Sequence, residues 1–193
     1  MKILAVSDEE SESLWSGQVR DVARGIDVII SCGDLRRDYL EFLLTMINAP
    51  LLYVFGNHDS NHAEGGICLD GRVIELGGVK FLGLGGSMRY RQGKNMYSED
   101  EMRRRYWRVL PRVWLSGGVD VLVTHAPARG WGDLDDLAHR GFETFNTILR
   151  RHRPSIMLHG HIHANYGRIK REHVHDSGTR IMNVFGFRII DFP

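Results

Sequence analysis

Side chains that can bind metal ions follow five apolar segments of the chain, at the points where those segments end. Asp8 and Glu10 come just after residues 2–6, and Asp34 follows residues 27–32. The other three segments lead into the sequences "GNHD" (56–59), "THAP" (124–127) and "HGHIH" (159–163). These segment ends supply carboxylates, imidazoles and one amide, and the candidate metal ligands are Asp8, Glu10, Asp34, Asn57, His125, His161 and His163.

This set of donors combines oxygen and nitrogen atoms and contains no thiolate. Such a mixture suits Mn²⁺, Fe, Zn²⁺ or Mg²⁺ and differs from the Cys-rich sites of structural zinc. The set is too large for one tetrahedral ion and suits two ions about 3.5–4 Å apart, an arrangement that enzymes use for displacement at phosphorus. The residue types therefore indicate a dinuclear metal site that acts on phosphate esters.

The elements that must position these residues alternate along the first part of the chain. Residues 2–6, 27–32 and 51–56 are typical of buried strands, and residues 11–24 and 37–47 have the apolar spacing of helices. This order favours parallel strands, whose carboxyl ends meet at one edge of a sheet and commonly hold a binding site.

The second part of the chain predicts a mixed sheet. Residues 72–76 and 79–86 form a predicted hairpin with a glycine turn, and residues 98–110 and 141–152 are predicted helices. Further strands are predicted at 119–127 and 155–163, followed by three closing antiparallel strands at 167–174, 179–186 and 187–192. We therefore expect one α/β domain over residues 1–193, with two mixed sheets packed face to face and helices outside.

Composition restricts the function classes. Of the 193 residues, 42% are hydrophobic and 25% are charged, and the net charge of +1 gives no general attraction to nucleic acid or membranes. The two cysteines suggest no disulfide framework, and the sequence has no apolar run long enough to span a bilayer. The start of the chain has no apolar core of the length that a signal peptide needs, so we expect a cytoplasmic protein.

The ordered motifs "SD-x-E" (7–10), "GD" (33–34), "GNHD", "THAP" and "GHIH" (160–163) resemble those of the calcineurin-like metallophosphoesterases. The resemblance covers essentially the whole chain and implies a four-layer αββα sandwich. It assigns Asp8 and His163 to a first metal ion, and Asp34 to a bridge between both ions. It assigns Asn57, His125 and His161 to the second ion, with Mn²⁺ expected first and Fe, Zn²⁺, Mg²⁺ or Ni²⁺ as alternatives.

The resemblance also implies a reaction. A metal-activated hydroxide would attack a small phosphomonoester or phosphodiester in line, and His58 would protonate the leaving oxygen as a general acid. Asn57 and His58 would contact the substrate. The basic loop at residues 87–97 has two interpretations, either a solvated surface loop or a segment that brings Arg89, Arg91 or Lys94 to the substrate.

Two positions depart from the family pattern. Glu10 stands where the family usually has a histidine, and we expect its carboxylate to bind the first metal directly and to favour Mn²⁺ or Mg²⁺. Arg37 stands where the protein phosphatase branch has an aspartate that orients the catalytic histidine, which argues against a protein phosphatase. Either Asp38 or Asp59 is a candidate to replace that aspartate.

A second function class follows from the same resemblance. Some relatives have lost their metals and serve as scaffolds for protein assembly, as the family member in the retromer coat does. Glu10 is the single mark of such decay, whereas His58, which binds no metal, would have little use in a scaffold. In the helix at 98–110 we expect the arginines at 103–105 to form i,i+4 pairs on a solvated face, and Trp107 and Trp114 to pack into the core.

Overall fold

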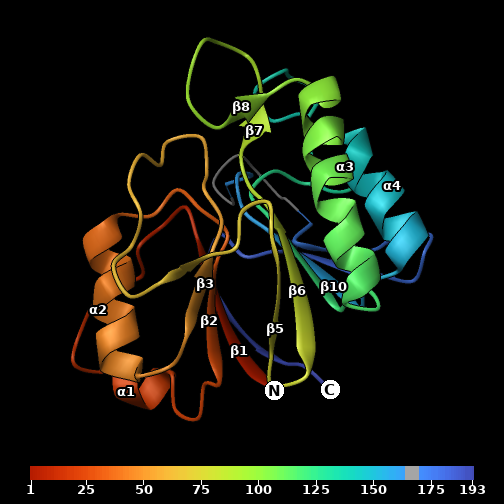
Figure 1. Cartoon of the computed structure of the whole chain (residues 1–193). Coiled ribbons are helices and arrows are strands. Elements are labelled where there is room, and N and C mark those ends of the chain that lie inside the picture. Colours follow the sequence, from red (N-terminus) through yellow and green to blue (C-terminus); the bar gives the residue numbers. More distant parts are fainter. Residues whose placement is uncertain (164–169) are drawn as a thin grey trace.

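Two β-sheets packed face to face form the centre of the protein, and helices cover the outer face of each (Figure 1). The computed structural model describes residues 1–163 and 170–193. The first sheet has the order β13-β1-β2-β3-β4 and the second the order β11-β12-β10-β9-β6-β5. The first sheet comprises β1 (Lys2–Ser7), β2 (Val28–Ser31), β3 (Leu51–Tyr53), β4 (Ile67–Cys68) and β13 (Gly186–Asp191). The second comprises β5 (Val73–Leu76), β6 (Val79–Leu84), β9 (Val121–Thr124), β10 (Ile156–His159), β11 (Glu172–Val174) and β12 (Arg180–Asn183).

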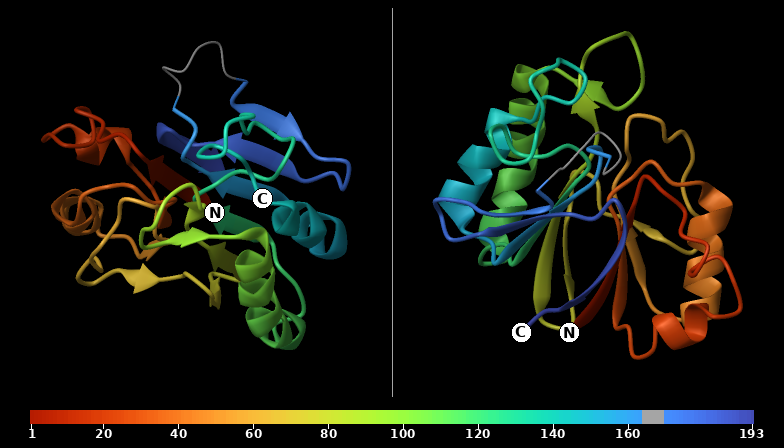
Figure 2. Two further views of the ribbon diagram at one scale, coloured as in Figure 1. Left: turned by 90° about the horizontal axis from the view of Figure 1, so that it is seen from above. Right: turned by 180° about the vertical axis from the view of Figure 1, so that it is seen from behind.

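The layers follow from strands that are apolar on both faces, as the strands of parallel sheets usually are. In β1, Ile3 and Ala5 face the core between the sheets, whereas Leu4 and Val6 face the helices. Figure 2 shows that α1 (Val19–Val22) and α2 (Arg37–Ile47) lie outside the first sheet. The helices α3 (Glu99–Leu115) and α4 (Glu143–His152) lie outside the second. The four-layer sandwich of two mixed sheets is therefore confirmed.

The parallel strands run in the direction that the sequence predicts. β1, β2 and β3 are parallel neighbours in the first sheet, and β6, β9 and β10 are parallel neighbours in the second. The predicted hairpin is also present as the antiparallel pair β5–β6. The carboxyl ends of these parallel strands therefore supply a common rim for the predicted ligands.

The closing strands differ from the prediction of three consecutive antiparallel strands. β11 and β12 are antiparallel, but β12 is parallel to β10, and β13 leaves this sheet to pair with β1. Gly186, with a φ of 75°, begins β13 just after the chain changes sheets. Residues 164–169, which include the start of the predicted strand 167–174, lie outside the described residues.

Two helices also differ from the predicted ones. The predicted helix at 11–24 is reduced to α1, because the serines before it form local turns: the amides of Leu14 and Trp15 donate to the carbonyl of Ser11. α3 begins with a capping box between Ser98 and Glu101 and continues through Pro111 to Leu115.

The prediction that Trp107 and Trp114 pack into the core is wrong, because they are 62% and 60% exposed. The buried stripe of α3 instead consists of Met102, Tyr106, Val109 and Val113. The two tryptophans follow stripe residues by one position and so face solvent. Among the described residues, no helix is both long and apolar enough to cross a bilayer.

Candidate metal centre

Three predicted ligands come together between the two sheets. Asp8 follows β1, Asp34 follows β2 and His125 follows β9, so the first sheet supplies two of them and the second sheet supplies one. One ligand atom from each of these residues lies within 4.8 Å of the corresponding atoms of the other two. This group, called the Asp8–Asp34–His125 cluster below, can share a divalent cation.

The backbone turns sharply at the ends of these strands. Asp8, Asp34 and His161 have φ values of 64°, 57° and 68°, in the left-handed region that residues other than glycine adopt infrequently. Each turn redirects the chain at a strand end, and the amide of Asp8 donates to the carbonyl of Gly33 (3.2 Å). Strained backbone of this kind is concentrated at functional sites.

Glycines allow the ligand loops to pack closely against one another. A Cβ atom on Gly56 would lie 2.0 Å from Oδ1 of Asp34, and one on Gly160 would lie 2.3 Å from Oδ2 of Asp8. A Cβ on Gly33 would lie 2.3 Å from the amide nitrogen of Gly56. The glycines of "GD", "GNHD" and "GHIH" therefore make room for the carboxylates and for the neighbouring loop.

His125 is fully buried and has a fixed orientation. Its Nδ1 donates to the carbonyl of Cys32 (2.8 Å), while its Nε2 lies 3.0 Å from Oδ1 of Asn57 and 3.3 Å from Oδ2 of Asp34. Burial alone would lower the pKa of His125, but the charge of Asp34 and its hydrogen bond raise it to about 9. A proton on Nε2 of His125 is therefore stabilised by the oxygens of Asn57 and Asp34. A metal cation in its place would have the same oxygens as ligands.

The two carboxylates of the cluster are held in their charged form. Burial would raise the pKa of Asp34, but His125 overcomes this effect and lowers it to about 2. The pKa of Asp8 is also lowered, against its burial, by a hydrogen bond from His163 and by the charge of His125. Both carboxylates are therefore ready to bind a cation at neutral pH.

The "GHIH" segment approaches Asp8 from the second sheet. The amide of His161 donates to both carboxylate oxygens of Asp8 (3.1 and 2.9 Å), and Nε2 of His163 lies 3.5 Å from Oδ1 of Asp8. His161 donates from Nε2 to the carbonyl of Ala138 (2.7 Å), which leaves Nδ1 as its basic nitrogen. Burial and the charge of His125 lower the pKa of His161 to about 3, so this imidazole is neutral and suited to a metal.

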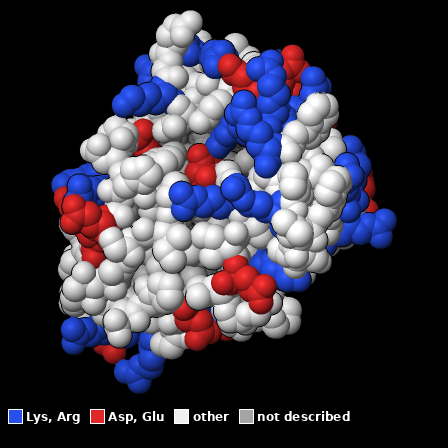
Figure 3. Space-filling model, viewed as in Figure 1, with Lys and Arg blue, Asp and Glu red and all other residues white. Residues whose placement is uncertain are grey.

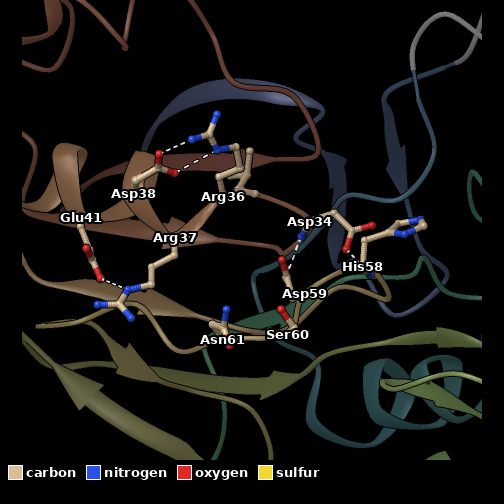
Figure 4. Close-up of a pocket in the computed structure, with 10 residues that line it drawn as sticks. Asp34, Arg36, Arg37, Asp38, Glu41, His58, Asp59, Ser60 and Asn61 are labelled. Atoms are coloured by element: carbon tan, nitrogen blue, oxygen red, sulfur yellow. Dashed lines mark hydrogen bonds and ion pairs between the residues drawn. The ribbon is translucent and has the colours of Figure 1, made fainter.

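The segment "GNHD" forms the other side of the centre. The amide of His58 donates to Oδ1 of Asp34 (2.8 Å), and its side chain is exposed at the rim. Oδ2 of Asp59 accepts from the amides of Gly56 (2.7 Å) and Asp34 (2.8 Å). Figure 4 shows His58, Asp34 and Asp59 at one end of an open pocket of about 540 Å³, which extends toward Arg37 and Glu41.

Comparison with known proteins agrees with this geometry. The family model described as the calcineurin-like phosphoesterase superfamily domain matches residues 1–184. The chain belongs to this superfamily. A curated relative from Caenorhabditis elegans, UPF0046 protein T07D4.2, is 34% identical over 103 residues, which are 52% of this chain and 25% of that protein. The match thus spans about a quarter of the length of that relative.

Solved structures of the same fold come from distant organisms. TT1561 of Thermus thermophilus has a TM-score of 0.65 at 14% identity, with 96% of this chain and 89% of that chain covered. A single mutant of Vps29 from Entamoeba histolytica has a TM-score of 0.51 at 15% identity, with 100% and 86% covered. At these identities the likeness shows the fold alone.

The ligand set of this calcineurin-like chain fits divalent cations. Charged carboxylates, a neutral imidazole and an amide oxygen converge, and the second nitrogens of His125 and His161 are fixed by backbone carbonyls. Backbone or carboxylate partners of this kind are usual behind metal-binding histidines. The carbonyl of Cys32 is a supporting group that sequence reasoning missed, since a backbone carbonyl leaves no signal in the residue types. The sequence singled out Asp59 for another role, and its carboxylate instead supports the loops by accepting from the amides of Gly56 and Asp34.

Glu10 and Arg89 have charged partners away from the cluster. The carboxylate of Glu10 lies 3.9 Å from Nε of Arg36 and, like His161 and His163, outside the Asp8–Asp34–His125 cluster, so its direct ligation of the first metal stays a prediction. The guanidinium of Arg89 pairs with Glu101 (2.7 Å) and lines a different pocket.

The expected substitutes for the missing aspartate also have other partners. Asp38 pairs with Arg36. Oδ2 of Asp59 accepts hydrogen bonds from the amides of Asp34 and Gly56. Within the described residues, neither carboxylate is hydrogen-bonded to the imidazole of His58. The amide bond to Asp34 therefore fixes the backbone of His58 beside the cluster, and not the direction of its imidazole.

Proposed function

We propose that this protein is a metal-dependent phosphoesterase that hydrolyses a small phosphomonoester or phosphodiester. The observation that carries the proposal is the Asp8–Asp34–His125 cluster, whose ligand atoms from both sheets lie within 4.8 Å of one another. Its place at the carboxyl ends of parallel strands is where α/β proteins bind their ligands.

The ligand set is proposed to hold two divalent cations, Mn²⁺ first among them. Asp8 and His163 would hold the first ion, Asn57 and His125 the second, and Asp34 both; Nε2 of His163 lies 3.5 Å from Asp8, and Nε2 of His125 lies 3.3 Å from Asp34 and 3.0 Å from Asn57. His161 would bind the second ion through Nδ1. When bound, such cations neutralise the phosphate oxygens and lower the pKa of water enough for it to attack phosphorus.

His58 is proposed to protonate the leaving oxygen. Its side chain is exposed at the rim while its amide is held 2.8 Å from Oδ1 of Asp34, so the imidazole stays beside the metal centre and remains accessible to substrate. Imidazole is the side chain that enzymes most often use to transfer a proton. The adjoining pocket, lined by Ser60, Asn61 and Arg37, offers space for the leaving group.

The proposal is tested by metal analysis together with turnover of p-nitrophenyl phosphate and its bis ester. We expect bound or readily loaded divalent metal and hydrolysis of at least one ester. His125→Ala should lose metal and activity together, whereas His152→Ala, at the end of α4, should keep both. A protein that binds none of Mn²⁺, Mg²⁺, Zn²⁺ or Fe and hydrolyses neither ester would refute the proposal.

A scaffold for protein assembly is the second proposed function. It is favoured by one observation, the contact of Glu10 with Arg36 (3.9 Å), which competes with the proposed ligation of the first metal by Glu10. The same assays separate the two functions, because a scaffold has no need for turnover. We further propose a cytoplasmic location, since Cys32 and Cys68 are both free thiols.

A further inference from the structure

A second pocket, of about 420 Å³, opens on one flank of α3 beside β8 (Met96–Tyr97). Figure 3 shows Lys and Arg side chains gathered over this part of the molecule. The pocket contains one acidic residue and is lined by Arg89, Tyr97, Glu101, Arg104, Arg105 and Arg108. We call it the arginine pocket.

Arg105 forms a fixed part of this pocket. Its guanidinium donates to the carbonyl of Gly85 (2.7 Å) and pairs with Asp70, and it lies 4.1 Å from the ring centre of Tyr97. Its side chain is only 14% exposed, so these contacts hold it in place. Arg89 is fixed in a similar way, because it donates to the carbonyl of Met96 (3.2 Å) and pairs with Glu101.

Arg104 and Arg108 have no such partners. Both are exposed, and across residues 1–163 and 170–193 no carboxylate lies within 4.0 Å of either guanidinium. The acids one turn earlier are already engaged, since Asp100 pairs with Arg103 and Glu101 pairs with Arg89. The expected i,i+4 pairing of the arginines at 103–105 is therefore wrong: Arg103 pairs at i,i+3 and Arg105 pairs outside the helix.

Two like charges at i and i+4 on a helix repel each other and destabilise it slightly. Arg104 and Arg108 have this spacing and line the same pocket, whereas the charges of Arg89 and Arg105 are offset by Glu101 and Asp70. A bound anion would remove the repulsion, and the planar guanidinium matches phosphate in both charge and geometry. We propose that the arginine pocket binds phosphate groups, as a site separate from the metal centre.

The floor of the arginine pocket is connected to the metal centre through the backbone. Arg105 holds the carbonyl of Gly85, and the next residue, Gly86, donates to the carbonyl of Phe55 (2.7 Å) and accepts from Ala126 (3.3 Å). Phe55 leads into "GNHD", and Ala126 follows His125. The bound phosphate group has two alternative sources. It is either a free phosphate anion or a second phosphate group of the substrate at the metal centre, and the second alternative rests on the proposed function.

The binding step is tested without metal, so that it does not depend on the proposed function. Calorimetric titration of the full chain with pyrophosphate, in EDTA and about 150 mM salt to screen weak surface contacts, should show saturable binding. Replacing both free arginines with Gln, which has a similar helix propensity, should weaken it at least about tenfold through the loss of charge-assisted hydrogen bonds. These substitutions are Arg104→Gln and Arg108→Gln together.

Arg112→Gln is the matched control, because Arg112 is exposed on the same helix but does not line the pocket. It should leave the pyrophosphate affinity unchanged. The proposal is overturned if the wild-type protein does not bind pyrophosphate, if the double variant binds it equally well, or if the control weakens binding as much.

A second arm identifies the source of the phosphate. If it belongs to the substrate, the double variant of the metal-loaded protein should raise KM for a diphosphate ester and leave KM for p-nitrophenyl phosphate unchanged. If it is a free anion, KM for both esters should be unchanged while metal-free binding is still lost. A protein inactive on every ester would refute the proposed function and leave the binding result intact.

Discussion

Gly160→Ala offers a direct test of how the chain positions Asp8. A Cβ atom at residue 160 would lie 1.9 Å from Oγ of Ser7 and 2.3 Å from Oδ2 of Asp8, whereas real Cβ contacts are not found below 3.0 Å. The φ of Gly160 is not in the left-handed region, so alanine adds no backbone strain. The effect of the substitution is therefore steric and is directed at one candidate ligand.

The magnitude follows from the two ways in which the clash can be relieved. If the surrounding loops shift, overpacking of this kind costs about 1–3 kcal/mol. If Asp8 moves instead, it gives up the hydrogen bonds from the amide of His161, and bonds to a charged group contribute about 1.5–3 kcal/mol. Either route lowers Tm by about 2–12 °C in a domain of this size. Displacement of the carboxylate should also weaken Mn²⁺ binding by about 10–100-fold.

The assay combines thermal unfolding of the metal-free protein with calorimetric titration of Mn²⁺. Gly17→Ala is the matched control, because a Cβ on Gly17 has no heavy atom within 4 Å and its φ is also outside the left-handed region. Both variants restrict the unfolded chain equally, so their difference reports the clash. A Gly160→Ala protein with the Tm and Mn²⁺ affinity of the control would refute the assignment of Asp8 as a tightly positioned ligand.

Three further predictions concern groups at and away from the centre. His58→Ala should keep the metal content of the wild type and lower kcat by about 10²–10⁴, the range of general acid catalysis; loss of metal by elemental analysis would instead make His58 a ligand. Glu10→Gln tests the expected direct ligation: it should weaken Mn²⁺ binding by about tenfold or more in calorimetric titration, whereas an unchanged affinity would leave the carboxylate with Arg36 alone. Burial and the charge of Arg151 lower the pKa of His152, so protonation favours the unfolded chain. The free energy of unfolding should therefore fall as pH drops below the ordinary histidine value of about 6.5, and His152→Gln should flatten this dependence in urea titrations at pH 5 and 7.

The positions of the ligands could be predicted because they depend on local rules. Polar residues stand at or just after the ends of β1, β2, β9 and β10, and parallel strands that share a sheet bring their ends to one edge. This reasoning is enough to bring Asp8 and Asp34 together from β1 and β2. Face-to-face packing of the second sheet, which the family resemblance implied, then adds His125 from β9.

Other features depend on choices that a single sequence does not reveal. β12 and β13 are both short segments rich in apolar residues, but the first joins β10 and the second joins β1, and this depends on which sheet edge is left open. Trp107 and Trp114 lie one position beyond the buried stripe of α3, and a shift of one residue turns a side chain by about 100°. Glu10 follows β1 close to both the candidate metal site and Arg36. Its position in the sequence does not tell which of the two its carboxylate contacts.

The left-handed residues distinguish the two proposed functions. Asn48 and Arg153 have positive φ values because they end α2 and α4, where such a conformation is usual. Asn95, with a φ of 54°, lies in the loop before β8, and its side chain donates to the carbonyls of Gly56 and Asp59. Asp8, Asp34 and His161 follow strands and have no such local cause, although each costs about 1–3 kcal/mol. All three are candidate ligands. The carboxylates of Asp8 and Asp34 lie within 4.8 Å of each other, and the amide of His161 donates to the carboxylate of Asp8. A surface used only for assembly gains nothing from this strain, whereas a metal centre needs the directions that it imposes. The backbone at the strand ends therefore favours a metal-binding phosphoesterase over a scaffold.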